Sequence, residues 1–188
     1  NKQITSGEGG MIASNNKKII DKCNSLKNLC FGQKIRFRHE EIGWNYRYTN
    51  MQAALANSQL KRIENIVSTK KKIGKTYYKL LNKNNKIYMP PPILNNKENI
   101  YWIVGILIKG SYTTAKTLSK YLLKHGIQTR PFFYPMNKQP ILKKYFKKKI
   151  KYKNSEYLSK YGIYLPSGLG LSKNQINYIC NKLNSFLK

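Results

Sequence analysis

Acidic residues are the scarcest class in this sequence. Its 188 residues include 7 aspartates and glutamates against 36 lysines and arginines, which leaves a formal net charge of +29. A positive field of this size favours anionic partners. One interpretation is a nucleic-acid-binding module, but no RRM, KH, zinc or helix-turn-helix signature accompanies the charge. We keep nucleic acid as an alternative and expect small phosphate-bearing ligands to be the main anions.

Cysteines and long apolar runs are also few. Cys23, Cys30 and Cys180 form no CxxC pair, which argues against a disulfide framework and against a cysteine metal site. The longest apolar run, residues 101–108, is too short to cross a bilayer, and no secretory leader pattern is present. We therefore expect a globular, cytoplasmic chain with reduced thiols, and 40% hydrophobic residues are enough for a buried core.

The opening segment holds a dense group of glycines. Residues 5–10 read TSGEGG, and three glycines around one glutamate predict a turn with positive φ or close backbone approach. Lys2 stands just before this turn. A shielded lysine can lose its proton near neutral pH, and the free amine then attacks carbonyls to form Schiff bases. Taken alone, Lys2 could equally be an ordinary surface lysine beside a tight turn.

A second block, residues 43–54, reads GWNYRYTNMQAA. Asn45 and Arg47 are two residues apart, so their side chains share one face of an extended chain. Together they offer amide and guanidinium donors that suit a phosphate group. The alternative is that Arg47 only pairs with a nearby acid.

A third block, residues 129–136, reads TRPFFYPM, and the segment LPS follows at residues 165–167. Pro131 favours an extended backbone at Arg130, and the next three residues supply aromatic surface for a sugar or a base.

These ordered blocks resemble the DegT/DnrJ/EryC1/StrS family of nucleotide-sugar aminotransferases, in which the catalytic lysine precedes a T-[TS]-G-E-G-G turn. The match runs along nearly the whole chain and is closest to the branch that forms perosamine on a GDP carrier. It implies an α/β fold of the aspartate aminotransferase type (fold type I). Residues 1–68 would be the C-terminal part of the large cofactor-binding domain, and residues 69–188 the small C-terminal α/β domain. Because the family's lysine lies near mid-chain, we expect this chain to be a C-terminal half.

The resemblance also implies an activity. The enzyme would use pyridoxal 5'-phosphate to convert a nucleotide-linked 4-keto-6-deoxy sugar, similar to GDP-4-keto-6-deoxymannose, into the 4-amino sugar, with L-glutamate as donor. Relatives that deoxygenate the sugar replace the lysine with histidine, so Lys2 favours transamination. One departure is Asn137, where relatives commonly have histidine. The alternative is a basic nucleic-acid-associated module or an inactive remnant.

The resemblance further assigns roles to individual residues. Lys2 would bind the cofactor covalently and move the proton, and Thr5 with the glycine turn would hold it in place. Asn45 and Arg47 would reach the cofactor phosphate of the neighbouring subunit, so that activity requires a homodimer. Arg130, Phe132 and Tyr134 would form the substrate-binding side of the site.

Hydrophobic periodicity and capping residues predict the remaining elements. Helices are expected over residues 16–28 and over residues 50–82, the latter interrupted only at Gly74. Further helices are expected from Thr113 or Thr114 to Lys124, over residues 155–161 and from Ser172 onward. Strands are expected over residues 101–108, 127–130 and 163–165. The lysine runs at 70–72 and 143–153 are expected to be solvated. His39-Glu40-Glu41 could form an acid–base or metal pair, but we favour a variable loop because sequence neighbours point in different directions. His125, in a last helical turn, is expected to be structural.

Overall fold

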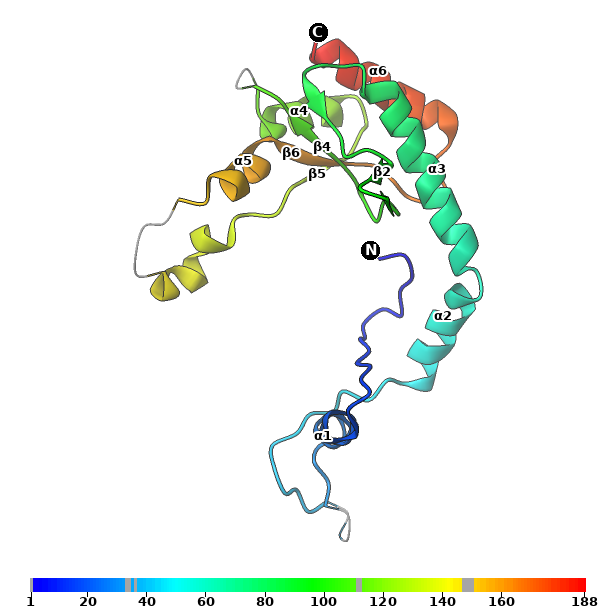
Figure 1. Cartoon of the computed structure of the whole chain (residues 1–188), viewed down its shortest axis with the longest axis vertical. Helices are drawn as coiled ribbons and strands as arrows, with labels where there is room; N and C mark the ends of the chain where they lie inside the picture. The colour runs from blue at the N-terminus through cyan, green and yellow to red at the C-terminus, as the bar shows by residue number, and fades with distance from the viewer. Residues whose placement is uncertain (1, 33–34, 36, 111–112, 147–150) are drawn as a thin grey trace. The chain divides into compact units, whose positions relative to one another are not determined.

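The computed structural model describes residues 2–32, 35, 37–110, 113–146 and 151–188. Their contacts divide the chain into two compact units, Asn1–Ile63 and Glu64–Lys188, which we describe separately (Figure 1). The division into large and small domains at residues 68 and 69 stays a prediction. Among the described residues, no helix combines the length and the apolar character needed to cross a bilayer.

The first unit contains the predicted helix α1 (Lys17–Lys27). Asn16 caps it, because its side chain accepts a hydrogen bond from the backbone N–H of Lys18 at 3.0 Å. The segment after α1 is irregular and is held by two isolated bridges, Asn28 with Asn45 and Phe31 with His39. Cys30 is buried between these bridges, at 2% exposure.

The predicted helix over residues 50–82 is two helices, α2 (Asn50–Leu60) and α3 (Ile63–Leu81). The break lies at Lys61 and Arg62, whereas Gly74, the expected interruption, lies inside α3. Gly74 is needed for packing, because a Cβ there would lie 2.2 Å from the ring of Tyr101. The glycine therefore makes room for a buried ring and does not break the helix.

The second unit is built on an antiparallel sheet of four strands in the order β1-β4-β6-β5. These are β1 (Ile87–Tyr88), β4 (Val104–Ile108), β5 (Arg130–Pro131) and β6 (Gly162–Leu165). In β4 buried residues alternate with half-buried ones, so one face of the sheet meets the core. Helices α3, α4 (Ala115–Lys124) and α6 (Lys173–Phe186) supply the rest of that core (Figure 1).

Strand lengths differ from the predicted ones. The strand expected over residues 101–108 begins at Val104, because Tyr101 has a positive φ of 49° that no regular strand allows. The strand expected over residues 127–130 covers Arg130–Pro131 only. A short hairpin follows the three prolines at residues 90–92. It consists of β2 (Ile93–Leu94) and β3 (Lys97–Glu98) and was not predicted from the sequence.

Three short elements lie between β5 and β6. They are the 3₁₀ turns η1 (Met136–Lys138) and η2 (Pro140–Tyr145) and the predicted helix α5, which spans Lys153–Tyr161. Residues 147–150 of the lysine-rich segment lie outside the described residues.

The caps predicted for the last helices are confirmed. Thr114 caps α4, and the side chains of Ser172 and Gln175 form a reciprocal capping box at the start of α6. His125 ends α4, where its Nδ1 lies 2.9 Å from the carbonyl oxygen of Tyr121. This histidine is structural, as predicted.

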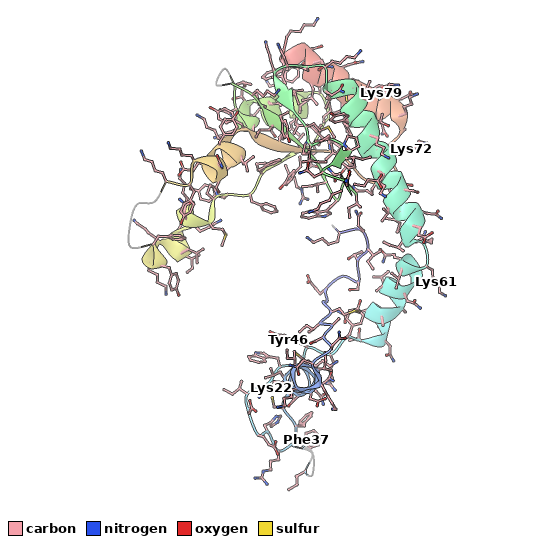
Figure 2. The ribbon with its side chains drawn as sticks, in the orientation of Figure 1. Lys22, Phe37, Tyr46, Lys61, Lys72 and Lys79 are labelled. Atoms are coloured by element: carbon pink, nitrogen blue, oxygen red, sulfur yellow. The ribbon has the colours of Figure 1, made fainter. Side chains whose placement is uncertain are left out.

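The lysine run at residues 70–72 is only partly solvated, which corrects the prediction. Lys70 is buried at 7% exposure, and its Nζ donates to the carbonyl oxygen of Ser167 at 2.7 Å and to the Ser167 hydroxyl at 3.2 Å. Burial lowers the pKa of Lys70. Lys72 and Lys79, by contrast, point away from α3 into solvent (Figure 2).

Candidate functional site

The glycine-rich loop after Lys2 adopts the predicted turn. Gly7 and Gly9 have φ values of 83° and 147°, a region that side chains rarely enter. The backbone N–H of Gly7 donates to the Thr5 hydroxyl at 3.2 Å. A Cβ on Gly9 would lie 2.5 Å from the ring of Tyr48, so this glycine also makes room for an aromatic neighbour.

The loop is also bound to α2 of the same unit. The side chain of Gln59 makes two hydrogen bonds with the main chain of Thr5, and Gln52 makes one with the carbonyl oxygen of Glu8. No sequence motif indicated a role for these glutamines. Their seven-residue spacing was visible, but it becomes meaningful only when the loop is known to run along this helix face.

Asn45 and Arg47 lie together, as their spacing predicts. The Nε of Arg47 donates to the Asn45 side-chain oxygen at 3.0 Å. Trp44 and Tyr46 alternate with this pair and stack on each other, with ring centroids 6.0 Å apart and planes inclined by 9°. The segment thus has one polar face that offers hydrogen-bond donors and one aromatic face.

His39 and Glu41 each contact a partner outside their own segment. His39 Nδ1 lies 2.6 Å from the carbonyl oxygen of Leu29, and Glu41 forms an ion pair with Lys22 of α1. Among the described residues no group of three metal-ligating side chains comes together. These contacts favour the interpretation as a loop over an acid–base or metal pair.

The aromatic block lies in the second unit, on the sheet face opposite the core. Phe132 packs over two glycines, since a Cβ on Gly162 would lie 2.3 Å and one on Gly105 3.1 Å from its ring. Its ring centroid is 4.7 Å from that of Tyr164. Phe132 is therefore half-buried, which identifies a packing role that the sequence did not indicate.

Phe132 also lines a cavity of about 290 Å³ on this face. Its wall includes three further aromatic side chains, those of Tyr88, Tyr101 and Tyr164. Arg130 precedes the cavity in β5, where it pairs in register with Tyr164, and both Arg130 and Tyr134 are exposed. Their predicted contacts with substrate stay predictions.

The predicted site residues thus fall into two groups. Lys2, Asn45 and Arg47 belong to the first unit, while Arg130, Phe132 and Tyr134 belong to the second. Within the first unit, Lys2 is exposed just before the glycine-rich loop. Asn45 and Arg47 are exposed on their own segment.

Comparison with known proteins gives a consistent result. The chain is 35% identical to the GDP-perosamine synthases of Escherichia coli O157:H7 and Vibrio cholerae, and each match covers 99% of this chain. It covers 49% and 50% of those proteins, so the chain spans about half the length of these curated relatives.

Solved structures show the same fold. The aminotransferase TlmJ from Streptoalloteichus hindustanus superposes with a TM-score of 0.85 at 17% identity, covering 97% of this chain and 48% of that one. Helicobacter pylori PseC, an aminotransferase involved in the biosynthesis of pseudoaminic acid, superposes with a TM-score of 0.83 at 21% identity, covering 93% and 47%. The predicted fold class, an α/β fold of the aspartate aminotransferase type, is thereby confirmed. Because the model of the DegT/DnrJ/EryC1/StrS aminotransferase family matches residues 1–184, the chain belongs to that family.

Proposed function

We propose that the protein is a pyridoxal-phosphate-dependent aminotransferase that converts a nucleotide-linked 4-keto-6-deoxy sugar into the 4-amino sugar. The substrate would be similar to GDP-4-keto-6-deoxymannose, the amino donor L-glutamate and the active form a homodimer. The observation that carries the proposal is Lys2, placed directly before a glycine turn that the structure holds through Thr5 and Gly7. The names of the relatives, GDP-perosamine synthases, support the sugar class.

The residues of the first unit fit parts of the cofactor. Pyridoxal phosphate offers an aldehyde and a phosphate, which require an amine and several hydrogen-bond donors. Lys2 provides the amine. Arg47 uses its Nε for Asn45, which leaves the four N–H groups of its terminal nitrogens to face a phosphate. A guanidinium oriented in this way binds phosphate in a bidentate manner.

Each residue would then have a defined task. The cofactor, when bound, supplies an electron sink that stabilises negative charge at the reacting carbon. Lys2 Nζ would hold the cofactor, and its amine, when displaced, would move the proton between the donor or sugar carbon and the cofactor. Arg47 and Asn45 neutralise and orient the phosphate of the partner subunit's cofactor. Arg130 would face the diphosphate of the substrate, with Phe132 and Tyr134 beside the sugar.

The homodimer is supported by the surface of the first unit. Helix α2 has no buried residue, and its apolar side chains Leu55 and Leu60 are 47% and 54% exposed. Met51 is 83% exposed, and on the preceding segment Trp44 and Tyr46 are 47% and 72% exposed. A group of exposed large apolar side chains often marks a contact between proteins. The segment with Asn45 and Arg47 is therefore suited to contact another polypeptide.

The test uses the full-length polypeptide. Incubation with pyridoxal phosphate should give the visible absorbance of a lysine-bound cofactor, and borohydride should remove that band and leave the added mass on the Lys2 peptide. Lys2→Ala should abolish both the band and amino transfer to the keto sugar, whereas Lys72→Ala, at an exposed lysine of α3, should retain both.

Two results would contradict the proposal. One is a protein that binds pyridoxal phosphate no differently after Lys2→Ala. The other is salt-sensitive retention of DNA without any lysine-bound cofactor, which would favour the basic nucleic-acid module suggested by the charge of +29.

A further inference from the structure

Helix α2 has one face that differs from the rest of its surface. Gln52, Ala56 and Gln59 are half-buried, while the other residues of the helix are exposed. Their spacing of four and three residues places them on one side of the helix. Ala56 is small and lies between the two glutamines, so a main chain can approach this face closely.

Gln59 holds the main chain of Thr5 on this face. Its Oε1 accepts from the backbone N–H of Thr5 at 3.1 Å, and its Nε2 donates to the carbonyl oxygen of Thr5 at 2.6 Å. The second hydrogen of Nε2 goes to the carbonyl oxygen of Leu55 at 3.0 Å. The carboxamide therefore pairs with Thr5 as a neighbouring peptide group would in a sheet, with both of its hydrogens used.

Gln52 holds the same loop three residues further on. Its Oε1 accepts from the backbone N–H of Thr49 at 3.0 Å and closes the capping box of α2. Its Nε2 donates to the carbonyl oxygen of Glu8 at 3.1 Å, which also accepts from the Ser6 hydroxyl at 2.9 Å. The oxygen of Gln52 thus serves the helix and its nitrogen serves the loop.

The two contacts match in spacing. Seven residues of α-helix rise about 10 Å, and three residues of chain can span at most about the same length. The loop from Thr5 to Glu8 can therefore run antiparallel to α2 with both ends fixed. Lys2 lies three residues before the first fixed point.

We infer that Gln59 and Gln52 are positioning residues that set the place of the Lys2 amine by clamping the main chain of the loop that follows it. This inference rests on the proposed function, in which Lys2 binds the cofactor. The main chain of Thr5 presents one donor and one acceptor, so its partner must both accept and donate. A carboxamide meets that requirement, whereas a carboxylate or an apolar side chain does not.

Three variants of the full-length protein separate the clamp from helix stability. Gln59→Met keeps the side-chain volume and removes every hydrogen bond. Gln59→Glu keeps the acceptor but opposes the carbonyl oxygens of Thr5 and Leu55. Gln52→Glu keeps the capping oxygen and loses only the donor to Glu8. The matched control is Gln175→Glu in the capping box of α6, a helix of the other unit, where the substitution changes the same cap chemistry.

Two measurements test whether the glutamines hold the loop. In the cofactor-free protein, hydrogen exchange at the Thr5 amide should become about tenfold faster in Gln59→Met, because its acceptor is lost. In the presence of pyridoxal phosphate, the dissociation constant should rise about tenfold in Gln59→Met and about fivefold in Gln52→Glu. Gln175→Glu should change neither quantity by more than twofold.

The pH dependence adds a readout that a general loss of stability would not change. A protonated glutamate can donate to a carbonyl oxygen, so Gln59→Glu should regain cofactor affinity between pH 8 and pH 5.5, relative to Gln59→Met at the same pH.

Two results would overturn the inference. One is that both Gln59→Met and Gln52→Glu keep the exchange rate of the Thr5 amide and the cofactor affinity within twofold of the unmodified protein. The other is that Gln175→Glu loses as much cofactor affinity as Gln52→Glu. If Gln59→Met does not fold, Gln52→Glu decides alone, because it preserves the cap. Failure of the unmodified protein to capture pyridoxal phosphate at Lys2 would refute the proposed function, and Thr5 exchange would still test the clamp.

Discussion

Replacing Gly74 with alanine tests the packing of the second unit most sharply. A Cβ at this position would lie 2.2, 2.3 and 2.4 Å from three carbons of the Tyr101 ring, where ordinary carbon contacts are about 3.5–4.0 Å. The ring would have to move by more than about 1 Å. Tyr101 is 2% exposed and its backbone N–H is held by the Asn99 side chain at 2.8 Å, so it has little freedom to do so.

Two opposing terms set the expected magnitude. Overpacking a core costs about 1–3 kcal/mol and sometimes more, whereas alanine is favoured over glycine inside a helix by about 1 kcal/mol. The overlap is severe, so we expect Gly74→Ala to lower the free energy of unfolding by about 2 kcal/mol. The measurement is urea unfolding of the full-length protein, with the change taken from the midpoint at constant slope.

The sign of the effect should reverse when the ring is removed. In a Tyr101→Leu background the space above Gly74 opens, and Gly74→Ala should then be neutral or stabilising through helix propensity. A double-mutant cycle gives the coupling between the two positions directly. If Gly74→Ala stabilises the protein that retains Tyr101, the close packing of this ring on α3 is wrong.

Other contacts make further predictions. Lys70→Met removes the two hydrogen bonds to the turn after β6, so it should lower the free energy of unfolding in urea by about 1–2 kcal/mol. Lys72→Met should change that free energy by no more than about 0.5 kcal/mol. Equal effects of the two substitutions would contradict the burial of Lys70. Burial raises the pKa of Cys180 from 9.0 to about 12. Above pH 9 the unfolded chain loses this proton first, so stability should fall between pH 9 and 12, and Cys180→Ala should make that fall shallower in alkaline unfolding curves. Gly9→Ala should reduce borohydride capture of the cofactor at Lys2 about tenfold, because the new Cβ would overlap the ring of an aromatic neighbour. Gly10→Ala has open space around its Cβ and should capture as much cofactor as the unmodified protein. Equal capture by the two variants would contradict the described geometry of the glycine turn.

Signals carried by a few neighbouring residues were the most reliable part of the prediction. Ser172 predicted the start of α6, and Thr114 was one of the two residues predicted to start α4, because caps satisfy backbone groups within one helical turn. The spacing of Asn45 and Arg47 predicted a shared face because side chains two residues apart lie on one side of an extended chain, and the two side chains are hydrogen-bonded. Local geometry determines each of these features.

Features that depend on distant partners were misread. Gly74 looked like an interruption, since nothing nearby indicates that a ring 27 residues further along the chain packs on it. Lys70 looked solvated as part of a lysine run, yet its amine reaches the main chain of Ser167. A run of like residues on a helix spans several faces, so one member can be buried while its neighbours are exposed.

The clamp on the lysine loop shows where sequence-based prediction of this site ends. The turn around Gly7 and Gly9 was predicted, because positive φ leaves a glycine signature. The residues that hold the turn lie 44 and 54 positions away, for the pairs Gln52 with Glu8 and Gln59 with Thr5. Glutamine is a common surface residue in helices, so two of them seven apart carry no signal by themselves. They gain meaning because both reach main-chain atoms of one loop, and a loop rich in glycines needs such support from outside its own segment if it is to hold the proposed site of Lys2 in place.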